Sequence, residues 1–267
     1  MALTKNTTFE QDFFLFLEKI RKNENFAFSR FSDGELYIMQ NRKIIIENKM
    51  AYVRESYHNG YWGDEELKQF IPEEQQFYRK KLIECFKHQQ ENYYKGISCR
   101  CCVGEKDFNF QFSLLEEKES DYLTWSNLLI NGNYSKFINI MVPELREKTI
   151  VLVCNKLAKL DFLPFKVEKV FRVGQNCHVT NYSLIEKMLD WVSANDIKNT
   201  VFLFSAASLS NFLIYELFKK FKNNTYIDIG STLNPYMKLK GWVDSRDYLA
   251  GYWLKKPSIY LYKKCVW

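Results

Sequence analysis

From residue 148 onward, short continuous apolar runs alternate with segments in which apolar residues recur at helical spacing. Continuous apolar runs are typical of parallel strands that are covered on both faces. The expected strands are residues 149–154, 167–173, 200–204 and 225–229. Residues 181–194 and 209–221 have the helical pattern and lie between successive strands. This alternation predicts a parallel sheet whose strands are connected by crossover helices.

The first part of the chain has a less regular pattern. Residues 8–22 have an amphipathic helical pattern that Thr7 or Thr8 can cap, and alternating apolar residues at 26–31 predict a strand. The remaining expected elements are a short β excursion at 43–46 and 51–53, a helical region at 64–92 broken near Pro72, a strand at 97–103 and a helix at 120–139. We interpret residues 40–145 as an elaboration on the same sheet. The expected fold class for residues 1–267 is a single α/β domain with a Rossmann-like, mostly parallel sheet and helices on both faces.

Polar or small residues follow the expected strands where those strands end: Asp33, Asn155, Gln175, Ser205 and Ser231. Ligands of open parallel sheets bind outside the carboxyl ends of the strands, so these side chains are candidates for one shared site. The competing explanation is that a strand must turn at its end and that turns favour Asp, Asn, Ser and Gly. It accounts for each residue singly better than for the whole set.

The most informative stretch joins the expected strand at 26–31 to a helical segment through Asp33-Gly34-Glu35. Two carboxylates at a helix start repel a phosphate unless a divalent cation bridges them, and hard oxygen ligands suit Mg²⁺ or Mn²⁺. The stretch therefore indicates a metal–diphosphate site in which Asp33 and Glu35 bind the metal and Arg30 contacts phosphate. Alternatively, Asp-Gly forms only a turn, and the two acids only complement the helix dipole.

Composition and charge narrow the classes of function. The 267 residues include 38 Lys and Arg against 32 Asp and Glu, which gives a net charge of +6. This mild excess favours anionic ligands such as nucleotides and shows no basic stripe, so we expect no nucleic-acid partner. The sequence shows neither a signal-peptide core nor an apolar run long enough to span a membrane. We therefore expect no transmembrane segment and a cytoplasmic protein.

The chain has 7 cysteines, an odd number that fits no disulfide framework and is typical of a reducing compartment. Cys99, Cys101 and Cys102 cluster as C-x-C-C. A zinc site there needs a second cysteine pair at suitable spacing, which the sequence does not show. Free thiols are therefore the preferred interpretation.

Three segments, in this order along the chain, resemble the GT-D-fold glycosyltransferases. Residues 30–35, Arg-Phe-Ser-Asp-Gly-Glu, are similar to an Arg-Phe-x-Asp-Gly-Glu block of that family. Residues 202–208 resemble its strand and small-residue loop, and residues 227–231, Ile-Asp-Ile-Gly-Ser, resemble a strand that ends in Asp-Ile-Gly. Ser-Arg-Asp-Tyr at 245–248 is similar to a segment of some relatives. The resemblance spans about residues 25–250.

The resemblance implies a GT-D-type fold and a metal-dependent glycosyltransferase with a nucleotide-sugar donor, a UDP-sugar favoured, and a glycan acceptor. In that case, Asp33 and Glu35 would contact Mn²⁺ or Mg²⁺ and the donor. Many relatives have His where this chain has Ser231, and some have Asp where it has Asn234. These departures put the acceptor-side chemistry and the identity of a general base in question.

The chemistry of sugar transfer suggests further roles. If configuration inverts at the anomeric carbon, the acceptor hydroxyl needs a base, and Asp228 at the end of its strand is the candidate. The alternative is that Asp228 only contacts neighbouring backbone. The residues expected to bind donor or acceptor are Arg30, Asn155, Ser205, Ser231 and Arg246. Residues 231–248 are expected to shape the acceptor pocket.

A few residues keep two interpretations. Arg54 is either a phosphate contact or part of a surface ion pair, and His178 is more readily a structural histidine than a ligand contact. The Tyr- and Trp-rich tail at 248–267 is a last strand, an acceptor platform or a contact in a homo-oligomer.

Two other classes of function remain as alternatives. One is another nucleotide-dependent enzyme on a Rossmann-like sheet, such as a hydrolase or dehydrogenase, although neither G-x-G-x-x-G nor the P-loop pattern occurs. The other is a non-catalytic module that binds a sugar or nucleotide, which the departures at Ser231 and Asn234 keep open.

Overall fold

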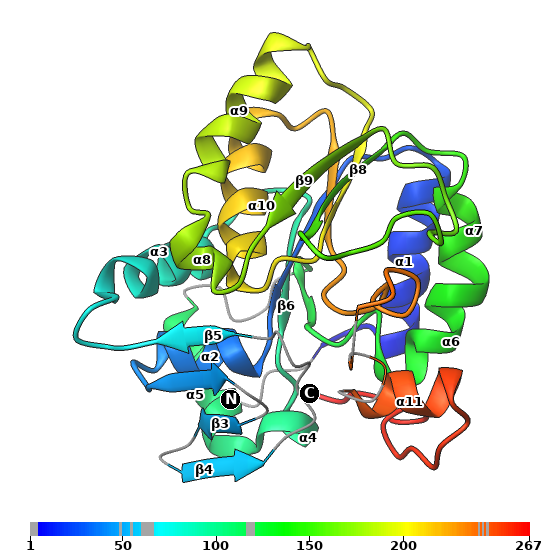
Figure 1. Ribbon diagram of the computed structural model, residues 1–267. Coiled ribbons are helices and arrows are strands. Elements are labelled where there is room, and N and C mark those ends of the chain that lie inside the picture. Colours follow the sequence, from blue (N-terminus) through cyan, green and yellow to red (C-terminus); the bar gives the residue numbers. More distant parts are fainter. Residues whose placement is uncertain are drawn as a thin grey trace.

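The computed structural model describes residues 5–47, 50–53, 56–59, 67–115, 121–239, 241, 243 and 246–267. A parallel sheet runs through its centre (Figure 1). Its strands, in spatial order, are β7 (Leu123–Trp125), β6 (Tyr93–Ile97), β1 (Ala27–Phe31), β11 (Thr225–Asp228), β10 (Val201–Phe204), β8 (Ile150–Asn155) and β9 (Lys169–Val173). Every neighbouring pair in this sheet is parallel. The predicted α/β fold with a Rossmann-like sheet is confirmed.

The strands predicted from apolar runs all lie in this sheet, and so does the strand predicted at 26–31. β1 is bonded to β11, with Ala27 opposite Tyr226, so a strand from the first part of the chain pairs with one from its last part at the centre of the sheet. All residues of β1, β10 and β11 are buried. Burial on both faces explains the continuous apolar run of β10. In β1 the buried Ser29 and Arg30 have polar partners, so its sequence pattern alternates.

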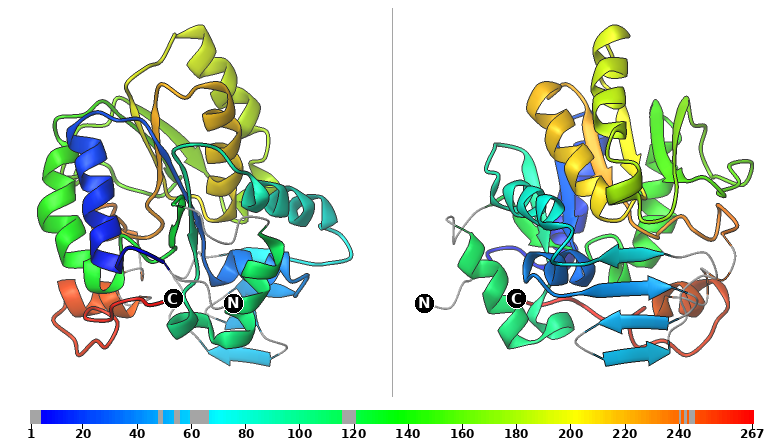
Figure 2. Two further views of the ribbon diagram at one scale, coloured as in Figure 1. Left: turned by 180° about the vertical axis from the view of Figure 1, so that it is seen from behind. Right: turned by 60° about the vertical axis from the view of Figure 1, so that its left-hand side comes forward.

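Helices cover both faces of the sheet, as predicted (Figure 2). One face packs against α2 (Asp33–Met39), α3 (Gln76–Lys87), α5 (Glu105–Leu114), α8 (Cys177–Thr180), α9 (Leu184–Ala194) and α10 (Ser208–Lys220). The other face packs against α1 (Phe9–Arg21), α6 (Tyr134–Lys136), a π-helical turn (Phe137–Met141), α7 (Val142–Leu145) and α11 (Asp247–Trp253). The first of these, α1, begins as expected, because the Thr8 hydroxyl accepts a hydrogen bond from Gln11 N at 3.2 Å. No helix within the described ranges is both long and apolar enough to cross a membrane.

The β excursion predicted at 43–46 and 51–53 exists, but its placement on the main sheet was wrong. It belongs to a second, antiparallel sheet of β2 (Ile44–Glu47), β3 (Met50–Val53), β4 (Ser56–Asn59) and β5 (Lys68–Phe70). The helical interpretation of 64–92 was also wrong at 68–70. This short segment pairs with β2 far away in the sequence, and a local pattern cannot show such pairing. The helix α3 begins only after Pro72.

Two more element predictions are corrected. The strand predicted at 97–103 is wrong beyond its first residue. Ile97 is the last residue of β6, and residues 100–103 form the short helix α4 (Arg100–Val103). Lys95 and Gly96 are buried, but they interrupt the apolar run of β6. The sequence pattern therefore did not identify residues 93–96 as part of a strand. The helix predicted at 120–139 contains β7 instead, with helical turns only from Asn131 onward. The tail at 248–267 continues α11 and then runs without regular structure, so it is not a strand.

The chain leaves the two central strands β1 and β11 toward opposite faces of the sheet. After β1, Tyr37 and Ile38 pack on the face that α10 covers, whereas after β11, Leu233 and Met237 pack on the face that α1 covers. Ligands of open parallel sheets bind where neighbouring connections diverge in this way. The carboxyl ends of β1 and β11 are therefore the place to look for a site.

Candidate functional site

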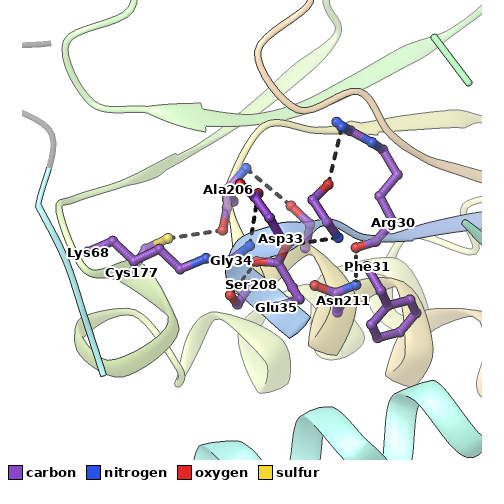
Figure 3. A network of polar contacts seen from close by, with 12 residues as sticks. Arg30, Phe31, Asp33, Gly34, Glu35, Lys68, Cys177, Ala206, Ser208 and Asn211 are labelled. Carbon is purple, nitrogen blue, oxygen red and sulfur yellow. Dashed lines mark hydrogen bonds and ion pairs between the residues drawn. The ribbon is translucent and has the colours of Figure 1, made fainter. Parts of the chain in front are cut away.

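Glu35 lies at the start of α2 with its carboxylate fully engaged (Figure 3). It is 6% exposed. Its Oε1 accepts hydrogen bonds from Lys68 Nζ at 2.8 Å and from the Ser208 hydroxyl at 2.6 Å. Its Oε2 accepts from the backbone N–H of Ser32 at 3.2 Å. One carboxylate therefore joins three segments that are far apart in the sequence: the loop after β1, the strand β5 and the start of α10.

Lys68 brings a positive charge to the first turn of α2, Asp33-Gly34-Glu35. A Cβ atom added at Gly34 would lie 2.6 Å from Lys68 Nζ, so the ammonium sits directly against this glycine. Burial alone would lower the pKa of Lys68, but the charges of Glu35 and Asp33 outweigh it and raise the pKa above its usual value. Likewise, burial alone would raise the pKa of Glu35, but Lys68 and Ser208 hold it below its usual value. The two groups form a buried ion pair.

Asp33 differs from Glu35 in being exposed. Its Oδ1 accepts a hydrogen bond from the N–H of Gly34 at 2.9 Å. Mg²⁺ and Mn²⁺ are commonly held by one or two carboxylates together with waters and substrate phosphates. Asp33 fits that role, whereas the Glu35 carboxylate is already committed to Lys68 and Ser208. Metal binding by Asp33 and Glu35 stays a prediction, and the geometry favours Asp33 as the ligand.

Arg30 connects the end of β1 to the end of β11. Its guanidinium is buried, its Nε donates to the carbonyl of Ser126 at 2.5 Å, and its Nη1 lies 3.9 Å from Asp228 Oδ1. Gly230 makes this placement possible. A Cβ atom at Gly230 would lie 1.9 Å from Arg30 Nη1, and the residue has a φ of +51°. Only glycine adopts that conformation readily and leaves room for the guanidinium.

Asp228, the candidate base, is buried at the end of β11. Burial raises the pKa of this carboxyl to about 7, against the lowering effects of Arg30 and of the hydrogen bond from Gly230 N. A general base works best when its pKa is near the working pH. Asp228 thus has the protonation behaviour that proton abstraction near neutral pH requires, and it also contacts the neighbouring backbone, as the alternative held.

Ser231 and Tyr248 join the segment after β11 to α11. The Ser231 hydroxyl and the Tyr248 hydroxyl are 2.7 Å apart, and Tyr248 is buried. Burial raises the pKa of Tyr248, while Ser231 and the charges of Arg30 and Arg246 lower it. Because both arginines act on this phenol, the predicted residues Arg30, Ser231 and Arg246 lie around one place.

Asn155 and Ser205 lie at the ends of β8 and β10, and their predicted ligand roles stay predictions. The Asn155 side chain accepts a hydrogen bond from Leu157 N at 2.9 Å, as a turn residue does. The described contact of Ser205 is its backbone N–H bond to Val153 O at 2.8 Å. His178 is buried and packs edge-on against Tyr78, and burial lowers its pKa to about 3, as expected of a structural histidine. Arg54 lies outside the described residues.

Sequence reasoning missed Lys68 and Asn211. Lys68 lay in a segment expected to be helical, so nothing pointed to its pairing with Glu35. The Asn211 amide donates to Arg30 O at 2.7 Å and to the Ser29 hydroxyl at 3.0 Å, which holds α10 against β1 (Figure 3). The Ser205–Ser208 loop precedes this helix, and Ala207 there has a φ of +45°. Such strain is costly for a residue with a Cβ and is concentrated at functional sites.

Comparison with known proteins supports the fold. No family model and no curated protein matches the sequence. Among solved structures, a glycosyltransferase with domain of unknown function 1792 from Streptococcus sanguinis is similar at a TM-score of 0.50 and 14% identity, over 85% of this chain and 81% of that chain. A second structure of that domain, described as a distinct glycosyltransferase fold, matches at a TM-score of 0.51 and 12% identity, over 82% and 77%. The expected likeness to the GT-D fold is thereby confirmed, and at these identities it concerns the fold alone.

Proposed function

We propose that this protein is a glycosyltransferase that moves a sugar from a nucleotide-sugar donor to a glycan acceptor. One observation carries the proposal. On a glycosyltransferase-like fold, the first turn of α2 with Asp33 and Glu35 meets Arg30 and Asp228 at the carboxyl ends of two adjacent central strands. Such an edge is where ligands of parallel sheets bind. In this proposal, residues 1–267 act as one glycosyltransferase-like domain.

The donor side is built from cations at the end of β1. Transfer leaves negative charge on a nucleoside diphosphate, and fixed positive groups stabilise that charge. Glu35 holds Lys68 against Gly34, and the carbonyl of Ser126 holds Arg30, so contacts within the protein position both cations. In this account Glu35 acts by positioning Lys68, whereas the sequence alone suggested that it binds a metal.

Mn²⁺ or Mg²⁺ remains part of the proposal, with Asp33 as its protein ligand. The ion would neutralise charge on the donor diphosphate. Asp33 offers an exposed carboxylate beside Lys68 for this purpose.

The acceptor side is assigned to Asp228 and to residues 231–248. Burial raises the pKa of Asp228 to about 7. Asp228 would therefore take the proton of the acceptor hydroxyl in an inverting reaction. The charge of Arg246 acts to lower the pKa of Tyr248, so the two side chains lie near each other, and they would contact the acceptor sugar. A UDP-sugar is the favoured donor. Asn155, Ser205 and Ser231 are further residues that would contact the donor or the acceptor. The same hypothesis includes a homo-oligomer formed through the aromatic tail.

A donor screen tests the proposal. Thermal unfolding is followed with UDP-, GDP- and dTDP-sugars, with and without Mn²⁺, and release of the nucleoside diphosphate is measured in parallel. Binding to the folded state raises the unfolding temperature by mass action. We expect stabilisation by one donor class, larger with Mn²⁺, and slow release of its diphosphate.

Two variants sharpen this screen. Asp33→Asn should lose the Mn²⁺-dependent part of the stabilisation. Asp196→Asn, at an exposed carboxylate that precedes the amino end of β10, should behave as wild type. Binding without turnover under any condition would favour the non-catalytic module, and no donor binding at all would refute the proposal.

A further inference from the structure

Four cysteine thiols gather at one place outside the candidate site. Cys99, Cys101 and Cys102 come from the segment that follows β6, and Cys265 comes from the tail of the chain. Their Sγ atoms all lie within 4.8 Å of one another, and those of Cys99 and Cys101 are 3.3 Å apart. The lone cysteine of the tail thus supplies the fourth thiol that the C-x-C-C sequence lacks.

The spacing of these thiols matches a tetrahedral metal site. Zn–S bonds of about 2.3 Å in a tetrahedron place the sulfur atoms about 3.8 Å apart. The four Sγ atoms are near that separation without a change of fold, because α4 turns the three local cysteines toward the tail. The backbone N–H of Cys102 donates to Cys99 O at 2.9 Å, which fixes this turn.

The surroundings of the thiols resemble the outer contacts of a thiolate site. The Asn127 amide donates to Cys102 Sγ at 3.4 Å and to Cys265 Sγ at 3.8 Å. The Lys263 ammonium lies at the same place, where it donates to Cys101 O at 2.8 Å. Amide donors and a cation offset the negative charge of metal-bound thiolates, and such outer partners orient the ligands.

Burial of the four thiols also suits a structural site. Cys99 and Cys265 are 1% and 2% exposed, whereas Cys101 is exposed and Cys102 is intermediate. A metal ion can therefore enter from the side of Cys101 and be closed in by the other thiols. Four thiol ligands with no other donor are typical of structural Zn²⁺ rather than of a catalytic ion, which keeps an open position.

We propose that Cys99, Cys101, Cys102 and Cys265 bind one structural Zn²⁺ ion. The ion fastens the tail to the segment that follows β6. The tail already lies there, because Gly132 N donates to Lys263 O at 3.0 Å and the Trp267 ring packs 5.2 Å from that of Phe112. The site is separate from the proposed transferase chemistry and does not depend on it.

Metal analysis of the tag-free full-length protein, purified under reducing conditions, tests this inference. We expect one zinc per chain in the wild type. Cys265→Ser and Cys101→Ser should each reduce the zinc content to near zero, and Cys154→Ser, at a buried thiol outside the cluster, should keep it. Cys101 is exposed, so Cys101→Ser should not disturb the packing of the core. The zinc content of this variant decides the test if Cys265→Ser does not fold. Circular dichroism checks the fold of each variant.

Reconstitution provides a second measurement. Protein stripped with a chelator and titrated with Co²⁺ should develop the visible bands of tetrahedral cobalt thiolate, and Zn²⁺ should abolish them. The inference is overturned by zinc retained in both cluster variants, or by wild type that binds neither Zn²⁺ nor Co²⁺ with its thiols reduced. A disulfide that involves Cys265 in the reduced preparation, or bound iron in place of zinc, overturns it as well.

Discussion

Replacing Glu35 with Gln is expected to destabilise the fold. The substitution removes the negative charge and leaves the ammonium of Lys68 buried beside Gly34 without its partner. The side chains of Lys68 and Glu35 are 13% and 8% exposed, so water screens the remaining charge only weakly. Removing one partner of a buried pair typically costs about 3–5 kcal/mol.

The lower end of that range applies to Glu35→Gln, because the amide can still accept the hydrogen bond from Ser208. A loss of about 3 kcal/mol corresponds to a fall in Tm of about 6–12 °C for a chain of this size. Urea unfolding and calorimetry measure both quantities. Asp33→Asn, at the exposed neighbour, is the matched control and should change the free energy of unfolding by less than about 0.5 kcal/mol.

The double variant with Lys68→Met separates the ion pair from other effects. Without the ammonium, Glu35→Gln no longer leaves an unpaired charge, so the double variant should recover most of the lost stability. Glu35→Gln with wild-type stability, or a double variant no more stable than the single one, would refute the reasoning. The pH dependence gives a further check. Because the pKa of Glu35 is lowered, its contribution to the free energy of unfolding is lost as the pH falls through that pKa. Because the pKa of Lys68 is raised, its contribution to the free energy of unfolding is lost only at strongly alkaline pH.

Three more predictions follow from single residues. Gly230→Ala should displace the guanidinium of Arg30, whose Nη1 lies 1.9 Å from the added Cβ position. The free energy of unfolding should fall by more than about 1 kcal/mol, and donor turnover should fall as well. Wild-type values of both quantities would contradict this prediction. Burial lowers the pKa of His178 to about 3. At a pH below about 6.5, the ordinary pKa of histidine, His178 therefore binds a proton in the unfolded chain but not in the folded one, and the free energy of unfolding should fall as the pH drops. Urea unfolding at pH 7 and pH 4.5 should show a loss of about 2 kcal/mol that His178→Phe lacks, and an equal loss in that variant would exclude His178 as the cause. Arg246→Ala should raise the KM for acceptor more than the KM for donor, and equal effects in steady-state kinetics would place it elsewhere.

Inner strands of the central sheet were predictable where they are buried on both faces and largely apolar. β8 and β10 have apolar side chains at nearly every position, so their sequence pattern identifies them without knowledge of the neighbouring strands. β6 has Lys95 and Gly96 in its middle, and β5 consists of Lys68, Gln69 and Phe70. Tertiary pairing decides the conformation of these two segments, and a local pattern does not contain it.

The candidate site divides in the same way. Arg30, Asp33, Glu35 and Asp228 were predictable because residues at the ends of parallel strands share one edge of the sheet. The ion pair with Lys68 was not, because 33 positions separate the two residues and no spacing rule connects them. The thiol of Cys265 likewise joins a cluster that begins at Cys99, so only the folded chain reveals the fourth thiol.

The measurement that tests the central claim most directly is the pH dependence of sugar transfer in wild type and in Asp228→Asn, with the donor that the screen identifies. We expect kcat/KM of the wild type to fall below about pH 7, where the buried Asp228 carboxyl, with its pKa raised to about 7, takes up a proton. Asp228→Asn should lower kcat by about 10²–10⁴-fold and abolish that pH dependence, with donor binding retained. Asp228→Asn that transfers sugar at the wild-type rate, with the same pH profile, would contradict the claim.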